Sequence, residues 1–220
     1  RDFFFFFLIS NLNLIKEDLK SKINNYHKVK IIAVSKTFSI EAIMPLIEYG
    51  HLDFGENKVQ EAITKWAEVK LTKPNIKLHL IGKLQTNKVK LALKLFDFIH
   101  SVDTKKLAKK IADEELKQNK KIKIFLQVNI GNEEQKSGIN KDYLNDFYSY
   151  CKNLNLNIVS LMCIPPADDN SEIFFKQMAQ LTKKFNLKEL SMGMSADYIE
   201  AAKNSATYIR VGSNIFGNRI

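Results

Sequence analysis

The stretch Ile31–Thr37, with the sequence IIAVSKT, carries the first copy of the pattern that decides the fold. Its apolar half, Ile31–Val34, predicts a strand buried on both faces, because no polar side chain interrupts it. The next segment begins with Ser39, a residue type that caps helices, and repeats apolar residues at helical spacing over 40–47. A strand, a loop and an amphipathic helix therefore follow one another directly.

The same alternation continues to the far end of the chain, and a second helix start is marked by Thr104. The expected strands are 31–34, 52–54, 77–81, 96–100, 122–128, 158–163, 189–192 and 207–211. Strict alternation implies parallel strands joined by right-handed crossovers. Eight such units favour closure, because a closed barrel leaves no edge strand. The sequence thus predicts an α/β fold, a single (β/α)₈ TIM barrel formed by one domain over residues 1–220.

An extra amphipathic helix is expected ahead of the barrel, where apolar residues share one helical face over 12–23 and Ser10 and Asn11 are candidate caps. The apolar run Phe3–Ile9 precedes it. This run is too short to span a bilayer and lacks the basic region that begins a secretory signal. We therefore predict an irregular N-terminal extension over residues 1–10 and no membrane association.

The formal net charge of +10 raises the question of a polyanionic partner. Nucleic-acid interfaces favour arginine, which occurs here only at Arg1, Arg210 and Arg219, whereas the lysines are spread over many predicted helix faces. A general lysine bias explains the charge, and we expect no nucleic-acid partner. Of the functions considered for this sequence, a polyanion-binding module is therefore the least favoured.

The two cysteines, Cys151 and Cys163, have neither the spacing of metal ligands nor the pattern of a disulfide framework. The sequence therefore predicts no metal site. It also predicts a cytoplasmic location, where thiols stay reduced.

Functional residues of such barrels lie at the C-terminal ends of the strands, and Lys36 follows the first strand closely. A lysine that is partly desolvated and close to other cations has a lowered pKa and can form an imine with an aldehyde. A solvated lysine at a strand end is the alternative for this residue taken alone.

Two loops rich in small residues follow the seventh and eighth strands, Ser191–Asp197 (SMGMSAD) and Val211–Gly217 (VGSNIFG). Small residues let backbone N–H groups approach an anion, and barrel phosphate sites commonly use these two loops. We expect Ser195, Gly212 and Ser213 to contact a phosphate. Each loop alone is equally well explained as a tight turn.

Three further polar residues lie in or directly after the predicted strands. Arg210 lies just ahead of the last loop, and its guanidinium suits the nitrogen of a pyridine ring; an ion pair with a carboxylate is the alternative. Asn57 follows the second strand and has two interpretations. It could donate a hydrogen bond to the hydroxyl oxygen of such a pyridine ring, or it could cap the helix that comes next. His79 lies in an apolar alternation typical of a satisfied core histidine, and we assign it no role.

The segments that carry a family resemblance are Ala33–Thr37, Phe54–Asn57, Ile81–Lys88, Gln127–Ile130, Lys136–Gly138, Leu161–Pro165, Ser191–Ser195 and Ile209–Ser213. Together they resemble the YggS/PROSC family of pyridoxal phosphate homeostasis proteins, which share the barrel of fold-type III enzymes such as alanine racemase. The sequence departs from the family pattern at Lys83, where proline is usual, and at Leu78, where an aromatic residue is frequent.

The resemblance implies that pyridoxal 5′-phosphate (PLP) is the cofactor. It makes Lys36 the lysine of the imine (Schiff base), Arg210 the partner of the ring nitrogen, and Asn57 and Met192 residues of the cofactor pocket. It makes Ser195, Gly212 and Ser213 the phosphate contacts, in agreement with their positions after the last two strands.

The implied function is that of a carrier or regulator in PLP (vitamin B6) and amino-acid homeostasis, without established turnover and with no catalytic residue. Arg210 would leave the ring nitrogen unprotonated, and racemases of this fold type take a second base from a separate domain that we do not expect here. An amino-acid racemase with a partner-supplied base is the alternative. The expected partners are PLP and apo forms of PLP-dependent enzymes, and the expected state is a monomer or a weak dimer.

Overall fold

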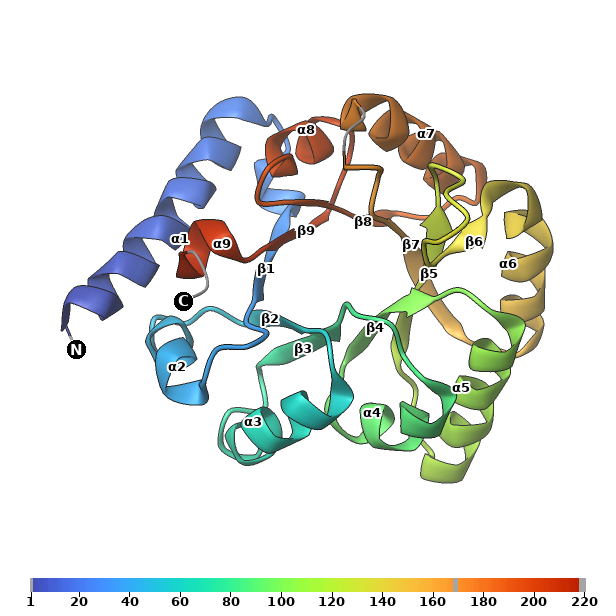
Figure 1. Ribbon diagram of the computed structural model, residues 1–220, viewed down its shortest axis with the longest axis horizontal. Helices are drawn as coiled ribbons and strands as arrows, with labels where there is room; N and C mark the ends of the chain where they lie inside the picture. Colours follow the sequence, from blue (N-terminus) through green and yellow to red (C-terminus); the bar gives the residue numbers. More distant parts are fainter. Residues whose placement is uncertain (1, 168–169, 218–220) are drawn as a thin grey trace.

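The computed structural model describes residues 2–167 and 170–217, and within them eight parallel strands close into a barrel surrounded by helices (Figure 1). The strands follow the order β4-β3-β2-β1-β9-β8-β7-β5, and a pairing of β4 with β5 closes the ring. A short strand, β6 (Ile139–Asn140), adds to the end of β5. The barrel strands are β1 (Lys30–Val34), β2 (Asp53–Glu56), β3 (Lys77–Leu80), β4 (Phe98–Val102), β5 (Lys123–Asn129), β7 (Asn157–Cys163), β8 (Glu189–Met194) and β9 (Tyr208–Val211). The predicted TIM barrel is confirmed.

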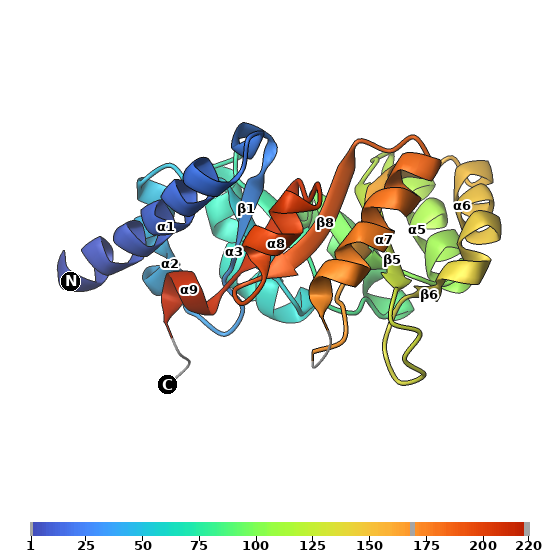
Figure 2. The same cartoon turned by 90° about the horizontal axis from the view of Figure 1, so that it is seen from above.

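The helices lie on the outside of the ring and alternate with the strands (Figures 1 and 2). They are α2 (Ile40–Glu48), α3 (Val59–Thr72), α4 (Val89–Leu95), α5 (Lys105–Gln118), α6 (Leu144–Asn153), α7 (Ser171–Lys184), α8 (Tyr198–Lys203) and α9 (Ser213–Phe216), with 3₁₀ turns at Tyr26–Lys28, Thr86–Lys88 and Lys141–Tyr143. Two of the predicted caps are confirmed, because Ser39 accepts a hydrogen bond from the N–H of Ala42 and Thr104 from that of Leu107, whereas the candidates Ser10 and Asn11 lie inside the first helix.

The N-terminal prediction was wrong, because helix α1 runs over Asp2–Lys22 and includes the segment expected to be irregular. Leu8 is fully buried and extends the apolar face by one turn. Asn11 lies inside the helix, where its side-chain amide donates to the carbonyl oxygen of Ile215 at 2.9 Å. Helix α1 thus packs beside α9 (Figures 1 and 2), a tertiary contact that local capping signals did not reveal. None of the described helices is long and apolar enough to cross a membrane.

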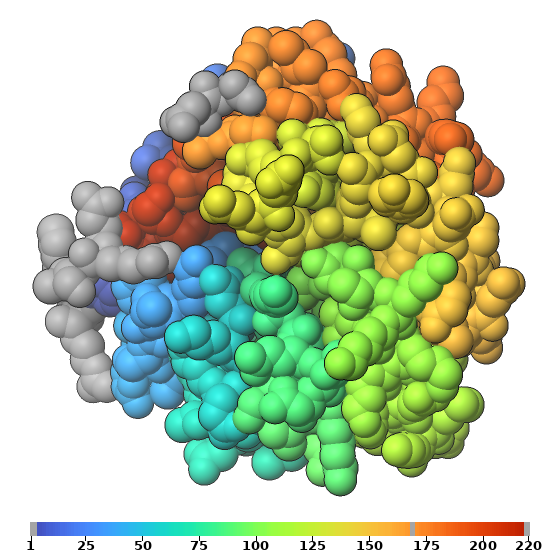
Figure 3. All heavy atoms as spheres, turned by 45° about the vertical axis from the view of Figure 1, so that its right-hand side comes forward, coloured from blue at the N-terminus to red at the C-terminus, as the bar shows by residue number. Residues whose placement is uncertain are grey.

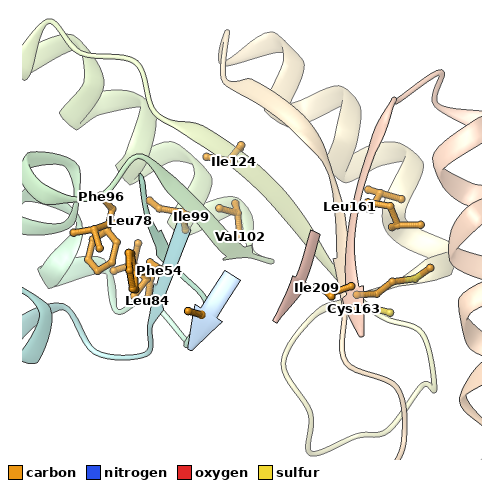
Figure 4. Packing of buried hydrophobic residues seen from close by; sticks show 14 of the residues in the cluster. Phe54, Leu78, Leu84, Phe96, Ile99, Val102, Ile124, Leu161, Cys163 and Ile209 are labelled. Carbon is orange, nitrogen blue, oxygen red and sulfur yellow. The ribbon is translucent and has the colours of Figure 1, made fainter. Parts of the chain in front are cut away.

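The core has two parts, because successive side chains of a strand point to opposite faces. The larger part lies between strands and helices and includes Phe54, Leu78 and Ile99 (Figure 4). The smaller part fills the barrel interior and consists of Ile32, Phe98, Phe125, Met162 and Tyr208. In β9 this alternation sends Ile209 and Val211 to the larger part, and Tyr208 and Arg210 inward.

Candidate functional site

A cavity of about 700 Å³ opens where the carboxyl ends of the strands meet their loops. Its lining comes from the segments after β1, β2, β3, β5, β7, β8 and β9. Six of the seven predicted site residues line it, namely Lys36, Asn57, Ser195, Arg210, Gly212 and Ser213. In the space-filling view (Figure 3) the segment after β5, coloured olive to yellow, lies beside blue and teal segments from the first half of the chain.

The seventh predicted residue, Met192, is placed elsewhere. It is fully buried in the core between strands and helices and is not among the residues that line the cavity. The alternation along β8 is the reason, because Ser191 points into the barrel and its neighbour must then point outward. Met194 lines the cavity instead, because the strand register of β8 shifts between Ser191 and Met194 and breaks the alternation there. A cofactor contact by Met192 stays a prediction without support from its position.

The charge of the cavity favours an anionic ligand. Lys36, Lys83, Lys136 and Arg210 line it, and no aspartate or glutamate is among the described lining residues. Lys136 pairs with Glu133 at 2.7 Å, but that carboxylate does not line the cavity. Lys83, the departure from the family pattern, therefore adds a cation to the rim. Lys136 was not predicted as a site residue, although it lies in one of the segments that carry the family resemblance.

The backbone ahead of Lys36 is held by a buried carboxylate. The Ser35 hydroxyl donates to Oε1 of Glu56 at 2.7 Å, and the Ser35 carbonyl oxygen accepts from Nζ of Lys65 at 2.9 Å. Glu56 is fully buried and also accepts from Lys65 (2.9 Å) and from the indole N–H of Trp66 (3.0 Å). Helix α3 thus fixes the strand end from which Lys36 enters the cavity.

The backbone after Lys36 is strained and tied to the same helix. Thr37 has a φ of 70°, a left-handed conformation that is unusual for a β-branched residue. Its N–H donates to Oε1 of Glu61 at 2.7 Å, and Nζ of Lys65 lies 3.2 Å from that oxygen. Burial raises the pKa of Glu61, but these two hydrogen bonds outweigh it and lower that pKa below its usual value. Such strain persists where surrounding contacts fix it, frequently at functional sites.

Asn57 is not the cap of the next helix. The residue at that position is Lys58, which makes no side-chain capping bond, whereas Asn57 lines the cavity. Of the two interpretations of Asn57, the helix cap is therefore wrong.

The two loops expected to bind phosphate are joined to each other. The N–H of Gly212 donates to Oγ of Ser195 at 3.3 Å, and the side-chain amide of Asn214 donates to the Ser195 carbonyl oxygen at 2.9 Å. Ser195, Ala196, Gly212 and Ser213 all line the cavity. Their N–H and O–H groups can serve as donors to an anion.

Arg210 lies at the inner end of the cavity and is only 4% exposed. One terminal nitrogen donates to Oγ of Ser191 at 2.7 Å and the other to the carbonyl oxygen of Cys163 at 2.8 Å. Within the described part of the chain no carboxylate lies within 4.0 Å of the guanidinium, so the ion-pair alternative is wrong for these residues. Burial lowers the pKa of Arg210, but a guanidinium stays charged in proteins.

The fold and this site define a class of protein: a barrel of the alanine racemase N-terminal kind, with a lysine and an arginine facing one cationic cavity. The family described as "Alanine racemase, N-terminal domain" matches residues 10–219. A solved alanine racemase from Clostridium difficile shares the fold, with a TM-score of 0.73 at 16% identity over 97% of this chain and 57% of that one.

Closer relatives define the family within that class. The pyridoxal phosphate homeostasis protein of Haemophilus influenzae is 34% identical over 95% of this chain and 94% of its own length, and that of Aquifex aeolicus 36% identical over 86% and 87%. The structure of PipY from Synechococcus elongatus, solved with PLP bound, has a TM-score of 0.85 at 33% identity and covers 96% of this chain and 100% of its own. The chain belongs to the family of pyridoxal phosphate homeostasis proteins.

Proposed function

We propose that this protein binds PLP in the cavity at the carboxyl end of the barrel and acts as a carrier or regulator in PLP and amino-acid homeostasis. The observation that carries the proposal is the cavity itself, in which Lys36, Arg210 and the joined small-residue loops come together with no carboxylate among the described lining residues. PLP is a phosphate monoester with an aldehyde and a pyridine ring, and each of these groups finds a matching residue type there. The PLP-bound structure of PipY supports the same conclusion.

Contacts to four chemical groups of PLP follow from this proposal. Lys36 supplies the amine that bonds covalently to the aldehyde carbon with loss of water. Ser195, Gly212 and Ser213 donate hydrogen bonds to the phosphate, and Arg210 faces the ring nitrogen. Asn57 donates to the ring hydroxyl oxygen. When bound, PLP supplies a reversible covalent bond to amines and a ring that can withdraw electrons from an attached carbon.

Arg210 favours binding over turnover. A guanidinium is too weak an acid to protonate a pyridine nitrogen, so the ring stays a weak electron sink. The racemase alternative would need a second base on the opposite face from Lys36. The described lining residues include no tyrosine, histidine or carboxylate for that task, although two further lysines are present.

A carrier needs acceptor proteins, and apo forms of PLP-dependent enzymes are the partner class that fits a protein able to release PLP. A cytoplasmic location and a monomeric or weakly dimeric state belong to the same proposal, because PLP-dependent enzymes of metabolism act there.

The decisive experiment is an absorption spectrum of the protein incubated with PLP, taken before and after borohydride reduction and followed by peptide mapping. We expect a visible band that reduction removes and an adduct on Lys36. Lys36→Ala should abolish the adduct, whereas Lys94→Ala, on the exposed side of α4, should leave it intact. An adduct on another lysine would overturn the site, and no binding at all would overturn the function.

A further inference from the structure

A line of hydrogen-bonded side chains crosses the barrel interior and ends on Arg210. Oγ of Ser191 accepts from Arg210 at 2.7 Å and lies 2.9 Å from Nδ1 of His100. Nε2 of His100 lies 2.9 Å from Nδ1 of His79, whose Nε2 lies 2.8 Å from Oδ1 of Asp53. We name Ser191, His100, His79 and Asp53 the interior chain. It links the cavity to the opposite end of the barrel.

The packing around the interior chain fixes the direction in which each imidazole nitrogen points. His79 and His100 are fully buried. The ring of His79 stacks on Phe98 at a centroid distance of 4.3 Å, and the ring of His100 stacks on Phe125 at 4.2 Å. Stacking holds the plane of each ring, and within that plane the ring nitrogens meet their partners along the interior chain.

The charge states of the two histidines are set by their surroundings. Burial lowers the pKa of His79, although Asp53 partly opposes this effect. Burial, together with the neighbouring His79 and Arg210, lowers the pKa of His100 well below its usual value. Both imidazoles are therefore neutral at pH 7, so each has one N–H donor and one bare nitrogen that accepts.

Asp53 then fixes the direction of every hydrogen bond. Its carboxylate can only accept, so His79 donates from Nε2 and accepts at Nδ1. His100 must donate from Nε2 to His79 and accept at Nδ1, which leaves the Ser191 hydroxyl as the donor to His100. Burial raises the pKa of Asp53, but the hydrogen bond from His79 and the charge of Lys30 outweigh it and lower that pKa, so the carboxylate is ionised.

We propose, building on the PLP-binding function proposed above, that Ser191, His100, His79 and Asp53 are positioning residues for Arg210. In the direction just given, the only proton of Ser191 is committed to His100, and its lone pairs face Arg210. With the chain reversed, Ser191 would accept from both His100 and Arg210, and its own proton would have no acceptor within the interior chain. Asp53 is the first residue of β2, at the end of the barrel opposite the cavity, and its side chain is 21% exposed. From there it orients Arg210, the residue that faces the ring nitrogen of PLP.

The first arm of the test uses the protein without cofactor. Proton–nitrogen correlation NMR of the imidazole rings is expected to show His79 and His100 neutral and protonated at Nε2. Asp53→Asn keeps the size of the side chain but can donate as well as accept, so it permits the reversed chain, and signals of the Nδ1–H form should appear. A wild-type protein with Nδ1–H or doubly protonated rings at pH 7 would overturn the proposal.

The second arm separates positioning of Arg210 from general packing. The ligands are PLP and an analogue in which C–H replaces the ring nitrogen. His100→Phe keeps a ring stacked on Phe125 but breaks the chain, and we expect it to weaken PLP about tenfold while leaving the affinity for the analogue unchanged. Met162→Leu, in the same interior cluster but outside the chain, should affect both ligands equally.

Equal losses for both ligands in His100→Phe, or no loss for either, would overturn the positioning role. If His100→Phe does not fold, the same ligand comparison in Asp53→Asn decides, with a smaller selective loss for PLP expected. A wild-type protein that binds neither ligand would instead contradict the proposed function, and the NMR arm would still decide the interior chain.

Discussion

The carbonyl oxygen of Asn57 occupies the space in which a side chain on Gly82 would begin. A Cβ at position 82 would lie 2.3 Å from that oxygen and 2.8 Å from the Asn57 Cα. On the other side, the Ser101 hydroxyl donates to the Gly82 carbonyl oxygen at 2.7 Å. The loops after β2 and β3 therefore meet backbone to backbone beneath the cavity that both residues line.

Gly82→Ala is expected to destabilise the protein by about 2 kcal/mol or more, because backbone atoms rather than a flexible side chain must move. Gly212→Ala is the matched control, since a Cβ there meets Val34 at an ordinary 3.5 Å and the backbone φ is −116°. Urea unfolding should show a loss for the first variant and little change for the second. Equal stability of both would show that the Asn57 contact relaxes easily.

A bulkier residue at position 212 tests the phosphate contact. Gly212→Leu should weaken PLP at least about tenfold while changing the affinity for unphosphorylated pyridoxal little, because only the phosphate depends on close approach to this loop. Fluorescence titration of both ligands measures the ratio. Similar losses for the two would mean that the loop shapes the cavity without holding the phosphate.

Lys65→Met should cost about 3–5 kcal/mol of stability, because it leaves the buried Glu56 carboxylate without its cation. The second oxygen of Glu56 already has no hydrogen-bond partner among the described residues, which makes the loss harder to compensate. In the double variant Lys65→Met/Glu56→Gln most of this loss should be recovered. Thermal unfolding of the three proteins checks the order, and a Lys65→Met protein as stable as wild type would contradict it.

Stability should fall as the pH drops from 6.5 to 4. Burial lowers the pKa of His51 from 6.5 to about 4, and burial also lowers the pKa values of His79 and His100. The unfolded chain binds these protons first, so the stabilisation is complete above pH 6.5 and is lost on acidification. Each such histidine contributes a slope of about 1.4 kcal/mol per pH unit in that window. The free energy of unfolding, measured with urea at a series of pH values, should change less steeply with pH in His51→Gln, by the contribution of one histidine. An unchanged slope would refute the assignment.

The PLP-loaded protein should exchange or racemise amino acids slowly at best. Arg210 weakens the electron sink, and loss of one positioned base is worth a factor of about 10²–10⁴. Incubation with single enantiomers in deuterated water, followed by mass spectrometry and chiral analysis, measures both exchange and inversion. Repeated turnover at about 1 s⁻¹ or faster would show that the cavity finds a second base.

The sequence alone determined the barrel and the strand ends that meet at its cavity. Apolar runs such as Ile31–Val34 and caps such as Ser39 are local signals, and eight of these units leave few arrangements other than a closed ring. Residues that directly follow a strand, such as Lys36 and Gly212, could be placed because all parallel strands end on the same side of the barrel.

Tertiary structure decided what depends on contacts between distant segments. Helix α1 begins early because Leu8 is buried in the core and Asn11 donates to Ile215 near the far end of the chain, which no capping signal shows. The face of β8 that turns inward decided against Met192 in the cavity. His79 was rightly read as a satisfied core histidine, but its partners Asp53 and His100 come from two other strands. A hydrogen bond across a barrel leaves no periodicity in the sequence, because its donor and acceptor are brought together only by closure of the sheet.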